Sequence, residues 1–204
     1  MPSDLQISNL KALDGTAGIS IADSTGNITL NNPITSGTFN GTIGTSASGF
    51  GLITEADQYR INTNLTGTSG TITSGWERVD DPSFAKIGTG VSESSGVFTF
   101  SQTGIFLILV EAEFQGLSGS DLYGGLRIRI DQGSGYTDRA EGKAGIVTTN
   151  ATGVASCNYI FDVTNTTNDK VIFERIVSDT TNVRLNGSTT HNQNSFTFIR
   201  LGDT

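Results

Sequence analysis

The sequence has few of the residues from which disulfide frameworks, metal centres and membrane spans are built. Its 204 residues include one cysteine, Cys157, and one histidine, His191. A single cysteine excludes an intrachain disulfide and a zinc knuckle. No run approaches the roughly 18 apolar residues of a membrane-spanning helix, so we expect no membrane insertion.

Positive charge is also scarce. The 12 Lys and Arg residues stand against 20 Asp and Glu residues, which gives a formal net charge of -8. Proteins that hold nucleic acid through its phosphates carry the opposite balance, so we expect no nucleic-acid partner. The first residues, Met1 to Gln6, form neither the basic segment nor the apolar run of a secretory signal. We therefore expect a protein that is made in a reducing cytoplasm and stays there or leaves by cell lysis.

Aromatic residues divide the chain into two parts. Residues 1–75 are rich in Gly, Thr, Ser and Asn, and their only aromatics are Phe39, Phe50 and Tyr59. Residues 76–204 hold the single tryptophan and nearly all the phenylalanines. We predict an N-terminal stalk or anchoring segment over 1–75 and a globular head over 76–204, an ordinary size for one domain.

Within residues 1–75, apolar and polar residues alternate on both sides of a turn. Ile19 and Ile21 alternate with polar residues, as do Ile28 and Leu30, and residues 23–27 between them favour a turn. This pattern predicts a short β-hairpin. An isolated two-stranded ribbon is marginal in water, so we expect its apolar residues to be buried against partner chains. The expected anchoring residues are Leu5, Ile7, Leu10, Leu13, Ile19 and Ile21.

Two further features of residues 1–75 bear on this interpretation. The composition also fits a flexible Gly/Thr/Ser tether, so that alternative stays open. Thr54 followed by Asp57 predicts a single capped helical turn between the stalk and the head.

Residues 76–204 consist of short alternating runs separated by turn residues, the pattern of an all-β sandwich or barrel. The runs 126–130 and 157–163 each have one apolar face. The run 105–110 and the C-terminal run 196–201 are apolar on both faces. In a monomeric β-sandwich each sheet has one face exposed to solvent. A strand with two apolar faces therefore indicates either a strand covered on both sides or a subunit interface. The expected interface residues are Ile105, Phe106, Leu107, Ile108, Phe196 and Phe198.

One sequence signature resembles a known family. Gly96-Val97-Phe98-Thr99, followed by Gly104-Ile105-Phe106, is similar to the signature of the complement-type globular heads related to tumour necrosis factor (TNF). The runs 126–131 and 195–201 match that family's middle and closing strands. The resemblance covers residues 76–204. It implies a ten-stranded jelly-roll sandwich that forms homotrimers about an axis lined by aromatic and aliphatic side chains.

Two segments resemble a different group of proteins. The Gly/Thr/Asn-rich N-terminal sequence, for example residues 14–18 and 21–26, is similar to virion proteins of tailed bacteriophages. Residues 76–90 resemble heads found in phages of marine bacteria. These resemblances imply a virion protein that is made in the host cytoplasm. Its N-terminal segment would contact other virion proteins.

Two functions are open for such a protein. It is either a tail fibre or knob that binds a glycan or protein of the host surface, or a capsid decoration (cement) protein that stabilises the shell. Loops are where recognition residues vary without harm to a core. The expected recognition loops are residues 115–125, 131–145 and 186–194.

Few residues offer catalytic chemistry. His191 lies in a polar turn, where we expect a solvated side chain, and Cys157 lies on an apolar face, where we expect a small buried hydrophobe. Glu111 and Glu113 share one strand face and match the acid and base of a polysaccharide-degrading tailspike. Such enzymes have much longer chains, so we predict a protein that is not an enzyme and uses no cofactor.

Several aspartates offer oxygen ligands for calcium, namely Asp80, Asp81, Asp131 and Asp169. No contiguous loop has the spacing of a calcium-binding motif. We therefore expect solvated turn residues and no metal.

Overall fold

The computed structural model describes residues 9–11, 17–21, 28–29 and 53–204 with the exception of residue 121. The chain separates into two units, Met1–Ala47 and Ser48–Thr204. All regular structure in the described residues is β-strand. No helix long and apolar enough to cross a membrane occurs in this described part of the chain.

The first unit contains a small antiparallel sheet of the order β1-β2-β3, with β1 at Asn9–Lys11, β2 at Ala17–Ile21 and β3 at Ile28–Thr29. The predicted hairpin is confirmed, because Ser20 pairs with Thr29 and Ile21 with Ile28. A third strand joins it on the other side, where Leu10 pairs with Ile19.

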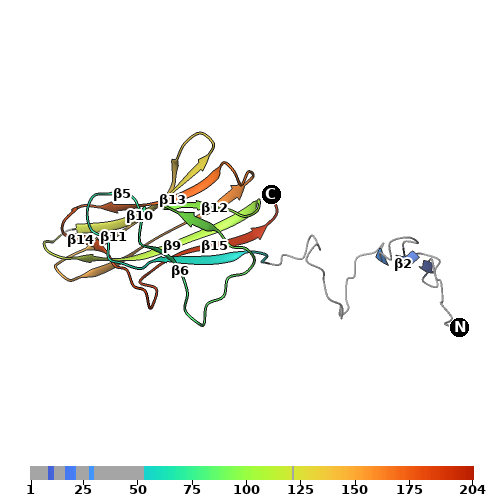
Figure 1. Ribbon diagram of the computed structural model, residues 1–204, viewed down its shortest axis with the longest axis horizontal. Helices are drawn as coiled ribbons and strands as arrows, with labels where there is room; N and C mark the ends of the chain where they lie inside the picture. Colours follow the sequence, from blue (N-terminus) through green and yellow to red (C-terminus); the bar gives the residue numbers. More distant parts are fainter. Residues whose placement is uncertain (1–8, 12–16, 22–27, 30–52, 121) are drawn as a thin grey trace. The chain divides into compact units, whose positions relative to one another are not determined.

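The second unit, which we call the head, consists of two antiparallel sheets that form two layers (Figure 1). The β13 sheet has the order β11-β10-β13-β8-β7, formed by β11 (Thr137–Ile146), β10 (Leu122–Gln132), β13 (Asp169–Val177), β8 (Val97–Thr99) and β7 (Ser92–Ser94). The β9 sheet has the order β12-β9-β15-β4-β6, formed by β12 (Thr152–Val163), β9 (Gly104–Gly116), β15 (Asn194–Gly202), β4 (Ala56–Ile61) and β6 (Trp76–Arg78).

These ten strands confirm the predicted ten-stranded jelly roll. Two shorter strands lie beside them in the described residues. β5 (Gly70–Thr71) pairs with β13, and β14 (Val183–Leu185) pairs with β9.

The core of the head is an aromatic cluster between the two sheets. Phe98 and Phe173 come from the β13 sheet, and Phe196 and Phe198 come from the β9 sheet; all four are at most 1% exposed. Trp76 lies edge-on to Phe98 and Phe196, with ring centroids 4.8 and 4.6 Å away. Edge-to-face contacts of this kind add to the stabilisation from burial, so the cluster joins the two layers.

The head begins earlier than the sequence predicts. β4 pairs with β15 on one side and with β6 on the other, so the predicted boundary at residue 75 is wrong. The helical turn predicted at Thr54 is wrong for the same reason. The sequence pattern does not predict β4 as a buried strand because Asp57 and Arg60 are charged. Both residues are nevertheless buried, and each forms an ion pair. Asp57 lies 3.1 Å from Arg78, and Arg60 lies 2.7 Å from Glu77.

The predicted loop 131–145 is also mostly strand, since β11 occupies Thr137–Ile146. Its inward positions include the small residues Ala140 and Ala144, which gives it a weak apolar pattern. The predicted loops 115–125 and 186–194 do connect strands, although their ends belong to β9, β10 and β15.

The first glycine of the TNF-like signature forms the turn between β7 and β8. Ser95 and Gly96 both have positive φ, 53° and 84°, as a two-residue hairpin with a type I′ turn requires. A Cβ atom on Gly96 would lie 2.2 Å from the carbonyl oxygen of Ile72. Only glycine fits this turn without displacing the neighbouring backbone.

We expect Gly96→Ala to lower the free energy of unfolding by about 2 kcal/mol or more, from left-handed strain and overpacking. Urea unfolding at one fixed protein concentration measures the difference. The control is Gly145→Ala in β11, where an added Cβ meets nothing within 4 Å. Equal stability of the two variants would contradict the assignment.

Candidate functional site

Strand β9 carries its two apolar faces on opposite sides of the sheet, as the alternation of a strand requires. Phe106, Ile108 and Val110 are at most 1% exposed and lie in the core. The residues between them point away from the core. Of these, Ile105 and Leu107 are half-buried, and Leu109 is 37% exposed.

The residues predicted at a subunit interface therefore fall into two groups. Phe106, Ile108, Phe196 and Phe198 are packed in the core of a single chain, so their prediction as interface residues is wrong. A side chain that is already enclosed by its own fold has no surface left for a partner. Ile105 and Leu107 do lie on the outer face of the sheet.

The neighbouring strands extend this outer face. Leu107 pairs with Ile160 of β12 on one side and with Ile199 of β15 on the other. Directly opposed side chains on one face of a sheet lie in contact distance of each other. Ile160 is 59% exposed, and Leu201 of β15 is 43% exposed. We call this surface the apolar face; its apolar residues are Ile105, Leu107, Leu109, Ile160, Ile199 and Leu201. Two exposed polar residues of β12 share the face, since Asn158 pairs with Leu109 and Asp162 with Ile105.

Further along β9 the outer face becomes polar. Glu111 and Glu113 both lie on it, as predicted from their spacing. The side-chain amide of Asn186 donates a hydrogen bond of 2.5 Å to Glu113, while Glu111 pairs with Ser195 and Ser156 in the adjacent strands. The apolar face is thus bounded by polar side chains at this end.

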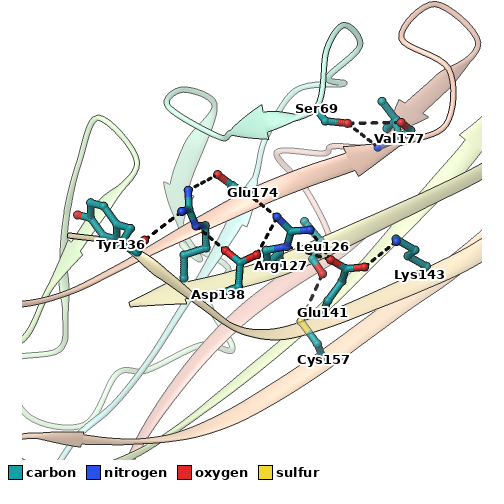
Figure 2. A network of polar contacts seen from close by, with 11 residues as sticks. Ser69, Leu126, Arg127, Tyr136, Asp138, Glu141, Lys143, Cys157, Glu174 and Val177 are labelled. Carbon is teal, nitrogen blue, oxygen red and sulfur yellow. Dashed lines mark hydrogen bonds and ion pairs between the residues drawn. The ribbon is translucent and has the colours of Figure 1, made fainter. Parts of the chain in front are cut away.

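The outer face of the β13 sheet has a different character (Figure 2). Arg127 lies within ion-pair distance of Asp138, Glu141 and Glu174, at 3.1, 2.6 and 3.4 Å. Lys143 lies 2.6 Å from Glu141, and hydrogen bonds from Lys143 and Arg127 lower the pKa of that carboxyl. Such exposed pairs add little stability, but they make this face well suited to water, unlike the apolar face.

The aspartates considered for calcium are engaged by their own surroundings. Asp80 pairs with Arg60 at 2.6 Å, and Asp131 and Asp169 accept hydrogen bonds from backbone amides of adjacent turns. Hydrogen bonds from the Ser83 side chain and amide lower the pKa of Asp81. In the part of the chain that the structure describes, no three Asp, Glu, His or Cys side chains lie close enough to hold a metal ion.

The one histidine and the one cysteine lie in the environments that the sequence predicts, exposed and buried respectively. His191 is exposed, with Nδ1 3.2 Å from the hydroxyl oxygens of Ser188 and Thr190. Cys157 is buried on the inner side of β12, and its Sγ donates to the carbonyl oxygen of Leu126 at 3.8 Å (Figure 2). Burial raises the pKa of the Cys157 thiol to about 11.

The predicted anchoring residues lie in the first unit. Leu10 belongs to β1, and Ile19 and Ile21 belong to β2. Leu5, Ile7 and Leu13 lie outside the described residues. Their role in anchoring stays a prediction.

We expect iodoacetamide to label Cys157 about a hundredfold more slowly in the native protein than in urea at about pH 8, because an ordinary thiol has a pKa near 8.5 and the thiolate is the nucleophile. Mass spectrometry follows the labelling. As a control, Ser156→Cys in a Cys157→Ser background places a thiol at an exposed position of the same strand and should react quickly. Fast native labelling of Cys157 would show that it is accessible.

Comparisons with known proteins bear on the fold. No protein-family model and no curated protein matches the sequence. Among solved structures, murine APRIL at pH 8.5 is 12% identical with a TM-score of 0.52, covering 72% of this chain and 98% of that one. Eiger TNF from S. frugiperda is 10% identical with a TM-score of 0.53, covering 73% of this chain and 93% of that one. Similarity at this identity shows the fold alone: the head is a TNF-like jelly roll.

Proposed function

We propose that this protein is a structural component of a tailed-bacteriophage virion, a homotrimeric fibre or knob. Its head is displayed outward and binds the host surface, and its N-terminal segment docks on other virion proteins. The head acts by binding, without catalysis and without a cofactor. The observation that supports the trimer is the apolar face of the β9 sheet, and the virion role rests on the sequence resemblance of residues 1–75 and 76–90 to phage virion proteins.

The apolar face supports a trimer because it is unsuited to water. Leu109, Ile160 and Leu201 are 37%, 59% and 43% exposed and come from three neighbouring strands. Covering such side chains gains about 25 cal/mol for each Å² of apolar surface removed from water. The apolar side chains gather around Leu107, which Ile160 and Ile199 oppose, while the polar Asn158 and Asp162 oppose Leu109 and Ile105. Large exposed apolar patches rimmed by polar residues mark protein contacts. The sequence resemblance to complement-type heads implies that three copies meet there.

The first unit supports an anchoring role. It has a sheet of its own, and its Gly/Thr/Asn-rich sequence resembles that of phage virion proteins. A trimer carries three such segments and three heads. Three weak contacts on one rigid particle bind far more tightly than one, without any new interaction.

We expect the full chain to sediment as a trimer at micromolar concentration and the variant Leu109→Glu/Ile160→Glu to sediment as a folded monomer. Burying an unpaired carboxylate in the interface weakens association by roughly 3 kcal/mol or more per carboxylate. Neither residue lies in the core of the head. Analytical ultracentrifugation gives the mass, and circular dichroism checks the fold.

The control for this experiment is Tyr123→Glu. Tyr123 is also 37% exposed, but it lies on β10 in the other sheet, near Lys143. This variant should remain a trimer. A wild-type chain that sediments as a stable monomer, or a double variant that stays trimeric, would refute an interface on the apolar face.

The location on the virion is tested by imaging. An antibody raised against residues 53–204 should label the tail of intact phage particles, and soluble head should compete with infection. If the antibody labelled the capsid shell and soluble head did not compete with infection, the protein would be a capsid decoration protein and not a tail fibre. Absence of label from purified particles would refute a virion role.

A further inference from the structure

Buried arginines in the head differ in how their charge is balanced. Among the described residues, Arg60, Arg175 and Arg200 are 1%, 5% and 8% exposed. Arg60 lies 2.7 Å from Glu77, and Arg200 lies 2.5 Å from Asp203. Arg175 has no carboxylate within ion-pair distance in the part of the chain that the structure describes. It is therefore the exception among the buried cations.

Arg175 is also short of hydrogen-bond acceptors. It lies on β13 with the same orientation as Phe173 and pairs with the buried Leu126 of β10. Its Nη2 donates to the carbonyl oxygen of Thr68 at 2.9 Å, whereas Nη1 is buried and has no partner among the described atoms. Burial lowers the pKa of this guanidinium. A desolvated cation without a counter-charge is costly, so a missing anionic partner would stabilise this position.

A cavity of about 190 Å³ lies beside Arg175. Its other walls come from the segment 65–74, which includes β5. Five hydroxyl-bearing residues of that segment line the cavity, namely Thr66, Thr68, Thr71, Thr73 and Ser74. Of these, Thr71 pairs with Glu174 of β13, so its side chain lies on the face opposite to Arg175, which pairs with Gly70. All five residues are exposed, and no side-chain hydroxyl among them is hydrogen-bonded to a described residue. The cavity thus combines one buried cation with neutral donors and has no acidic residue in its lining.

We propose that this cavity binds a small oxyanion, with Arg175 as its cationic partner and the hydroxyls of Thr66, Thr68 and Ser74 as further donors. Guanidinium groups pair strongly with carboxylate, sulfate and phosphate oxygens. The volume is below the roughly 300 Å³ of a site for a drug-sized ligand, so the cavity admits one anionic group. That group is either a free inorganic ion or the acidic substituent of a saccharide whose remainder lies over the exposed loop.

The site goes beyond the proposed function. All of its residues belong to one chain, and none of them is part of the apolar face. Its test is therefore independent of trimerisation and of the location on the virion.

Isothermal titration calorimetry of the full chain at constant ionic strength tests the proposal with three probes, sodium sulfate, inorganic phosphate and glucuronate. We expect binding by the wild type and a loss of about tenfold or more in affinity for Arg175→Gln. The control is Arg184→Gln, which removes a half-buried arginine of β14 that already bonds to Asn186. This control should keep the wild-type affinity.

If Arg175→Gln does not fold, the variants Thr66→Val and Thr68→Val test the proposal instead, because both remove a hydroxyl from the exposed segment that lines the cavity and leave the guanidinium in place. Each should weaken binding several-fold. Binding of sulfate or phosphate alone identifies a free ion, and binding of glucuronate identifies an acidic saccharide. The proposal is overturned if no probe binds the wild type, if Arg175→Gln binds as well as the wild type, or if both threonine variants keep full affinity.

Discussion

The alternation of side chains along β9 is the constraint on which both the fold and the proposed assembly depend. This strand pairs with β12 and β15, so its register is fixed on both edges. Phe106 and Ile108 thereby enter the core, while Leu107 and Leu109 remain outside. A slip of one residue would exchange the two sets and leave phenylalanine in water. One strand thus supplies the centre of a core and the centre of an apolar surface.

Buried ion pairs hold β4, a strand near one edge of the β9 sheet, although this strand carries charged residues. Asp57 of β4 accepts bonds from Arg78 and from the amide of Val91, and Arg60 pairs with Glu77 across the β4–β6 ladder. Breaking such a buried pair leaves an uncompensated charge, so each pair ties β4 to a particular neighbour. Arg175 departs from this rule, which is why an external anion is the natural partner for it.

The sequence was sufficient for the jelly roll and insufficient for the faces of its strands. The apolar runs of β9 and β15, the one-sided alternation of β12 and the Gly96 signature predicted the sandwich, because alternation and turn chemistry are local properties. β4 was missed because its burial depends on Arg78 and Glu77, which are distant in sequence. For Phe106 and Phe198, a two-sided apolar pattern does not tell which side faces the opposite sheet. The sequence did not single out Arg175, because arginine is common in strands and only the structure shows that this one is buried without a carboxylate partner.

The position of the aromatic residues separates folding from assembly. Every ring of the central cluster is supplied by one chain, and Phe98, Phe173, Phe196 and Phe198 are at most 1% exposed without any partner. The apolar face, in contrast, is aliphatic and lies on the other side of the β9 sheet. The core therefore needs no side chain from a second copy, and the proposed association would add stability to it by mass action. The residues that line the cavity beside Arg175 likewise all belong to one chain.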